Sequence, residues 1–107
     1  PDDSLSPEAS KKIVELRNKL AYRDYFTANL YRKLDSPHSA LIYYNSVIKD
    51  YNDTEYYEPS FLGKVQVLLE MEKIDEAKSI IQLYKKNFPN GKYLKDIAEL
   101  ERTVFIK

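Results

Sequence analysis

The chain of 107 residues is the size of one domain, and 17 basic side chains balance 17 acidic ones to a net charge of zero. It therefore lacks the basic excess typical of nucleic-acid-binding proteins, and without cysteine it excludes thiol catalysis, disulfides and Cys-ligated zinc. No apolar run approaches the ~18 residues of a membrane span. Because the chain opens at Pro1 and not at methionine, we expect it to be a C-terminal piece of a longer protein.

The composition favours helices over a turn-rich β fold. The chain has only two glycines and is rich in Lys, Glu, Leu, Ala and Ile, which are good helix formers or common helix residues. No stretch alternates apolar and polar residues long enough to predict a strand. We therefore predict an all-α fold.

The first predicted helix is unusually long and spans about residues 7–33. Ser6-Pro7-Glu8 is a typical helix start, with an N-cap serine, proline at the first helical position and an acid in the first turn. Two helices broken near Ala21 are the alternative. Apolar residues at helical spacing predict one wide buried stripe, made by Ile13, Leu16, Leu20, Tyr22, Tyr25, Phe26, Leu30 and Leu34.

Four shorter helices follow. Ser36-Pro37 repeats the start signal of the first helix, with Ser36 expected as the N-cap. Pro89-Asn90-Gly91 ends the fourth helix, because proline cannot continue the hydrogen-bond ladder and Asn-Gly tolerates positive φ. These helices are expected at about residues 37–50, 58–71, 74–88 and 92–105.

The chain contains an internal repeat with an offset of 37 residues. At this offset Ala40 aligns with Ala77 and Tyr44 with Ile81, so a small residue is followed one turn later by a bulky one in both copies. This spacing, with a breaker further on, matches the second half of the tetratricopeptide (TPR) pattern. Because such hairpins cannot bury their apolar faces alone, we predict a single TPR-like domain over 1–107, with antiparallel helical hairpins stacked as a short α-solenoid.

A third, partial copy of the repeat is visible at the N-terminus. The segment 1–5 resembles the turn at 52–56, which lies 51 positions later instead of 37. The excess of about 14 residues equals about four helical turns. We place these turns in the first helix and expect it to project past its neighbours.

Several segments resemble the BamD family, TPR lipoproteins of the outer-membrane β-barrel assembly machinery. Residues 16–31 are similar to a long helix late in that family, 40–54 to its next helix and its Asp-Tyr-Pro-Asp-Thr turn, and 88–93 to the following turn. The likeness covers about residues 1–95 and corresponds to the last two of five repeats. Asn52 replaces the usual proline, and Tyr43 lies in the region where enterobacterial members carry an arginine facing the partner.

The resemblance implies a non-enzymatic protein–protein scaffold on the periplasmic face of the outer membrane. Its implied partners are the POTRA region of the barrel-forming subunit BamA and other subunits of the machinery, and it needs no cofactor, small-molecule substrate or nucleic acid. Membrane attachment is implied only through a lipid on a cysteine that these residues do not contain. Exposed tyrosines with flanking charges suit such a contact. The expected partner-binding residues are Asp35, His38, Tyr43, Lys49, Tyr56 and Tyr57.

Two alternatives remain open at this stage. One is a generic TPR module of the cell envelope that binds a peptide or protein partner, for instance in its concave groove, and the other is a small helical ligand-binding or hydrolase domain. The second requires a convergent polar cluster, but His38 is the only histidine and no set of residues has metal-ligand spacing. Gly63 either permits close helix packing or is neutral. The tyrosines expected in the core are Tyr25, Tyr31, Tyr44 and Tyr84.

Overall fold

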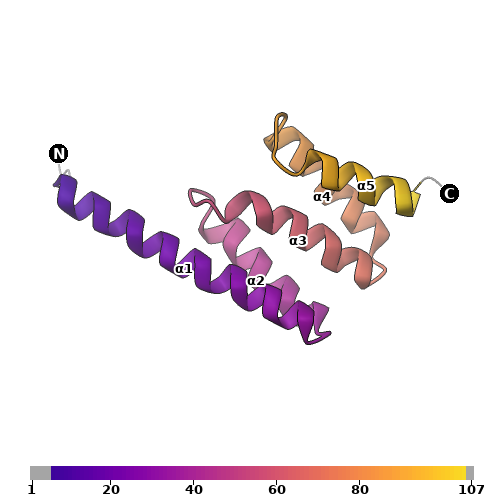
Figure 1. Ribbon diagram of the computed structural model, residues 1–107, viewed down its shortest axis with the longest axis horizontal. Coiled ribbons are helices and arrows are strands. Elements are labelled where there is room, and N and C mark those ends of the chain that lie inside the picture. The colour runs from indigo at the N-terminus through magenta and orange to yellow at the C-terminus, as the bar shows by residue number, and fades with distance from the viewer. Residues whose placement is uncertain (1–5, 106–107) are drawn as a thin grey trace.

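The computed structural model describes residues 6–105, and this part of the chain consists of helices joined by turns and contains no strand (Figure 1). The all-α prediction is confirmed. The partial repeat at 1–5 lies outside the described residues. The helices are α1 (Pro7–Lys33), α2 (Pro37–Asp50), α3 (Tyr57–Glu70), α4 (Ile74–Asn87) and α5 (Leu94–Phe105), each within two residues of its expected bounds.

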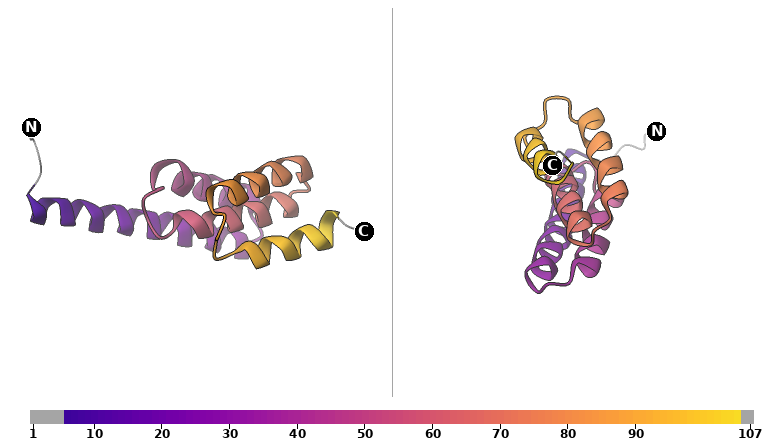
Figure 2. Two further views of the ribbon diagram at one scale, coloured as in Figure 1. Left: turned by 90° about the horizontal axis from the view of Figure 1, so that it is seen from above. Right: turned by 90° about the vertical axis from the view of Figure 1, so that its right-hand side faces the viewer.

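The helices form two layers, as a TPR-like solenoid requires. Each of α1 to α4 packs against the helix that follows or precedes it in the chain. Viewed along the stack, α1, α3 and α5 lie on one side and α2 and α4 on the other (Figure 2). The predicted stacking of helical hairpins is therefore present, with α1–α2 as the first hairpin and α3–α4 as the second.

The first helix is continuous and projects beyond the rest of the molecule. It has 27 residues, whereas α3 has 14, and it is not broken near Ala21, whose side chain is fully buried. The repeat offset aligns α3 with residues 20–33, so residues 7–19 are the overhang (Figure 1). At 1.5 Å per residue this overhang is about 20 Å long.

Both hairpins turn through the same corner. Asp35 and Glu72, 37 residues apart, are the only non-glycine residues with positive φ in the described part, at 58° and 61°. At each corner the backbone N–H of the next residue donates to a carbonyl five residues earlier, at 2.9 Å and 2.8 Å, which is the Schellman arrangement. The 37-residue offset of the sequence repeat is thus also the separation between the two equivalent backbone corners.

The corner explains why one of the two predicted N-cap residues makes no side-chain hydrogen bond. The Ser6 hydroxyl accepts from the Ala9 N–H at 3.1 Å, as expected for an N-cap. Ser36 is the N-cap residue of α2, as predicted, but its side chain makes no capping hydrogen bond. Its N–H already completes the corner by donating to the Tyr31 carbonyl, and its ψ of 72° departs from the extended value of 158° at Ser6.

Small residues let α2 pack closely against its neighbours. Ala28, Ala40, Tyr44 and Val67, from α1, α2 and α3, form one buried cluster. A Cβ added to Gly63 would overlap the Tyr44 ring, so the ring occupies the space that any other residue would fill. The Tyr44 hydroxyl also donates to Asn29 Oδ1 of α1. Gly63 is therefore required for close packing, and one tyrosine joins three helices.

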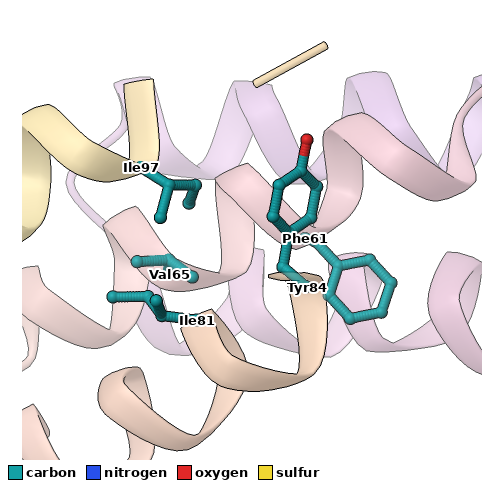
Figure 3. Packing of buried hydrophobic residues seen from close by; sticks show 5 residues of the cluster. All are labelled: Phe61, Val65, Ile81, Tyr84 and Ile97. Carbon is teal, nitrogen blue, oxygen red and sulfur yellow. The ribbon is translucent and has the colours of Figure 1, made fainter. Parts of the chain in front are cut away.

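A second cluster joins α3, α4 and α5 (Figure 3). Its buried members are Phe61, Val65, Ile81, Tyr84 and Ile97. The Tyr84 hydroxyl donates to Glu58 Oε2 at 2.7 Å and accepts from the Tyr93 N–H at 2.9 Å, while the Lys92 N–H donates to the same carboxylate oxygen at 2.7 Å. These bonds hold the α4–α5 turn against the start of α3, which places α5.

The stripe predicted to be buried on α1 is mostly exposed. The face of α1 that contacts α2 carries Ala21 and Ala28, which are fully buried. Within the predicted stripe only Leu20 and Tyr25 are half-buried. The other positions are exposed because no described helix lies over them. Among the tyrosines expected in the core, Tyr44 and Tyr84 are buried. The exposed members of the stripe are Ile13, Leu16, Tyr22, Phe26, Leu30 and Leu34.

Gly63→Ala is expected to lower the free energy of unfolding by about 1–3 kcal/mol, because the buried Tyr44 ring has no space to move away from the new methyl group. The cost of the steric overlap is therefore expected to exceed the ~1 kcal/mol by which alanine is more favourable than glycine inside a helix. Urea unfolding followed by circular dichroism measures it. In a Tyr44→Leu background most of the penalty should vanish, and an equal penalty in both backgrounds would contradict the contact.

Alkaline pH should weaken the fold through Tyr84. Burial and hydrogen bonding to the Glu58 carboxylate raise the pKa of Tyr84 to about 12, whereas an unperturbed tyrosine has a pKa of 10.0. The neutral phenol thus favours the folded state fully below pH 10, and this contribution is lost as the pH rises towards 12. Urea unfolding in this range should show stability falling more steeply with pH in the wild type than in Tyr84→Phe. Tyr22→Phe, at a ring 51% exposed, should keep the wild-type slope.

Candidate partner-binding surfaces

The candidate sites begin with the residue types that could hold a metal ion. No group of three or more His, Cys, Asp or Glu side chains between residues 6 and 105 could hold a metal ion. His38, in the first turn of α2, is exposed. None of the described helices has the length and apolarity needed to cross a bilayer. The candidate sites are therefore surfaces, and three of them differ in chemistry.

The first surface is the outer face of α2. His38, Ile42, Asn45 and Lys49 follow one another at helical spacing, and all four are exposed. We call these four residues the α2 ridge. Ile42 is 60% exposed and is the most exposed large apolar residue of this helix. It was not among the predicted residues, although it lies off the apolar stripe of α2 and could have been found by that position.

Two further predicted residues lie close to this ridge along the chain, Asp35 before α2 and Tyr43 at the middle of α2. Asp35 is exposed in the left-handed corner before α2. Tyr43 is half-buried, with its ring stacked on that of Tyr31 at 5.7 Å and an interplanar angle of 17°. Lys49 lies at the other end of α2, a 14-residue helix about 20 Å long. The six predicted residues are therefore not gathered in one compact patch.

Tyr56 and Tyr57 pack between helices near the α2–α3 turn. The Tyr56 ring lies 5.8 Å from Tyr22 and 5.7 Å from Tyr25, and Tyr56 is half-buried. Tyr57 is also half-buried, and its ring lies 5.1 Å from Phe61, within the second core cluster. Both side chains hold the turn in place, and the structure does not bring them together with His38.

The second surface is a groove along α1, α3 and α5. Arg32 of α1 donates to Glu70 Oε2 at 2.9 and 3.1 Å and to Gln66 Oε1 at 2.9 Å. The Arg32–Glu70 pair lines two open cavities of about 490 and 320 Å³ and separates them. The larger cavity is also lined by Phe26, Asn29 and Lys33. The smaller one is also lined by Gln66, Leu69, Leu100 and Val104.

The third surface is α1 itself, which Arg17 fastens to the turn after α2. The Arg17 guanidinium donates to both Asp53 carboxylate oxygens, at 2.8 and 2.9 Å, and to the Asp50 carbonyl. It also lies 5.3 Å from the centre of the Tyr51 ring. The hydrogen bonds from Arg17 lower the pKa of Asp53, so this carboxylate stays ionised below the usual range for aspartate. This clamp lies within the overhang, two residues before its last residue, Lys19.

Arg17→Ala should loosen the overhang without unfolding the two hairpins, because the clamp joins the overhang to the turn at Asp53 and takes no part in either core cluster. Amide hydrogen exchange should become faster in residues 7–19 and stay unchanged in α3. Since both partners are partly exposed, at 36% and 51%, high salt should reduce the difference from wild type.

Low pH should have the same effect on the wild type as the substitution, because the contribution of Asp53, whose pKa is lowered, is lost as the pH falls and the carboxylate becomes protonated. Equal rates of amide hydrogen exchange for residues 7–19 in wild type and Arg17→Ala, at neutral pH and low salt, would show that the clamp does not hold the overhang.

Comparison with known proteins adds one finding to this geometry. A family model described as YfiO, outer membrane lipoprotein, matches residues 1–79. The matched range includes all of α1, α2 and α3 and the beginning of α4. No curated protein and no solved structure matches the chain significantly.

Proposed function

The chain belongs to the YfiO family of outer membrane lipoproteins, and we propose that it acts as a non-enzymatic scaffold in a BamD-like subunit of the β-barrel assembly machinery. The proposed partner of this part of the subunit is the POTRA region of BamA, reached from the periplasmic face of the outer membrane. Family membership supports the envelope location, and the resemblance of the α2 region to BamD supports the choice of partner.

The observation that carries the proposal is the exposure of Ile42 on the α2 ridge. An apolar side chain 60% exposed, with His38, Asn45 and Lys49 before and after it on the same face, has the composition of a small interface with an apolar centre and a polar rim. The other large apolar side chains of α2 are buried or half-buried. Docking of a partner would remove Ile42 from water.

The α2 ridge is also held in a fixed position, which lowers the entropic cost of binding. On the α1 side of the same helix, Tyr43 stacks on Tyr31 and the Ser46 hydroxyl donates to Asp24 Oδ2 at 2.7 Å. On the α3 side, Tyr44 is locked over Gly63. The partner therefore meets a surface that does not need to rearrange.

The remaining predicted residues take different roles in this proposal. Asp35 extends the contact with a charge beyond His38, and the half-buried Tyr43 adds apolar area beside Ile42. Tyr56 and Tyr57 act through packing, because their rings fix the turn that follows Lys49.

Ile42→Asp is expected to weaken binding to the purified POTRA region of BamA by at least about 10-fold, because it puts a charge at the apolar centre of the contact. Isothermal titration calorimetry measures the affinity. Leu83→Asp, at a side chain 42% exposed on α4, is the matched control and should bind like wild type. Both variants should melt like wild type, and unchanged affinity of Ile42→Asp would remove the α2 ridge from the interface.

A further inference from the structure

The groove along α1, α3 and α5 contains one guanidinium that both of its cavities share. Arg32 lines the cavity of about 490 Å³ and also the cavity of about 320 Å³, and so does its partner Glu70. The Arg32 side chain is 32% exposed, so a molecule in either cavity can reach it. A ligand that follows the groove therefore has to pass this ion pair.

Glu70 does not pair with Arg32 in the strongest geometry that a carboxylate can adopt. The Arg32 Nε and Nη2 groups both donate to Glu70 Oε2, at 3.1 and 2.9 Å, whereas the strongest pairing uses two parallel hydrogen bonds to two carboxylate oxygens. Because both side chains are partly exposed, at 32% and 44%, the pair adds little to stability. A second carboxylate can therefore displace Glu70 at small cost.

The charges around this pair favour an anionic ligand. Lys33 lines the larger cavity beside Arg32, it is exposed, and no described residue forms an ion pair with it. Among the described residues, Glu70 is the only acidic one that lines either cavity. Two cations and one anion leave an excess of one positive charge, which attracts a further carboxylate.

The positions of the cavities indicate where this carboxylate lies in its own chain. Phe26 lines the larger cavity, whereas Leu69, Leu100 and Val104 line the smaller one, so apolar contacts are offered on both sides of Arg32. A polypeptide that uses both sides must continue in both directions from its carboxylate. The carboxylate is therefore the side chain of an internal Asp or Glu, and not the end of a chain.

The cavity volumes favour an extended segment over a helix. A helix 10 Å across has a volume of about 420 Å³ per turn, so neither cavity holds much more than one turn. Single side chains of an extended segment fit such cavities. Alternate side chains of this segment point the same way, about 7 Å apart. The matching pattern is an acidic residue with an apolar residue two positions before it and two positions after it.

We propose that Arg32 is a binding site for an internal Asp or Glu of an extended segment of another protein, and that Glu70 is the internal competitor for this site. In the unbound protein Glu70 occupies the guanidinium. The ligand carboxylate replaces it, while the apolar residues on either side enter the two cavities. The site is formed by α1, α3 and α5, so it is separate from the α2 ridge.

Fluorescence polarisation with the full-length protein tests the competition. The probe is a labelled peptide with the central sequence Leu-Thr-Glu-Thr-Leu, blocked at both ends so that it has no terminal carboxylate. Glu70→Gln removes the competing charge at constant size and should raise the affinity for this peptide at least fivefold. Glu76→Gln, at a side chain of α4 that is 60% exposed, is the matched control and should bind like wild type.

The gain must depend on the guanidinium. Arg32→Gln in the Glu70→Gln background should remove it. Equal affinity of wild type and Glu70→Gln, no binding by either, or a gain that survives without Arg32 would each overturn the proposal. A gain of affinity cannot come from loss of the fold, so Glu70→Gln decides the question even where the double variant melts early.

Two further peptides identify the source of the carboxylate. The blocked peptide with glutamine in place of its glutamate should show no gain in Glu70→Gln. The glutamine peptide with a free C-terminal carboxylate should also show none, and a gain with either peptide would overturn the assignment to an internal acidic residue. Ile42→Asp should leave all of these affinities unchanged. None of them requires BamA, so the failure of this proposal is distinguishable from failure of the α2 ridge.

Discussion

The architecture depends on how closely α2 approaches α3, and Gly63 sets that distance. With a Cβ at this position the Tyr44 ring would have to move, and Tyr44 is held on its other side by a hydrogen bond to Asn29 of α1. A single side chain therefore fixes the spacing of three helices. The fully buried Ala28 and Ala40 belong to the same cluster, which shows that close approach of the backbones is the common requirement.

The two hairpins have similar backbone geometry, but their exposed side chains differ. Their corners at Asp35 and Glu72 have the same left-handed geometry. The ends of α1 and α3, and both the beginnings and the ends of α2 and α4, lie 37 residues apart. At the surface, however, Phe26 replaces the equivalent of Gly63, and α1 continues for 13 residues past the helix to which it corresponds. These differences leave the first hairpin with two exposed faces, one on each helix.

Those two faces have different chemistry, which allows them to bind different structures at once. The α2 ridge has one apolar residue between polar ones and a single cation at its end, and we assign it to another subunit. The exposed face of α1 is apolar over three consecutive turns, at Tyr22, Phe26 and Leu30, and Glu70 of α3 lines the same cavity as Phe26.

The sequence by itself determined the local structure: the helix bounds to within two residues, the length of α1, the repeat offset and the resemblance to the family. Proline, Asn-Gly and apolar spacing act on neighbouring residues, so no distant contact is needed to interpret them. Only the tertiary structure decided which face of α1 is buried and that Tyr56 and Tyr57 pack between helices. The physical reason is that an apolar stripe has the same sequence pattern whether or not another helix covers it. Its burial depends on which helix the fold places over it.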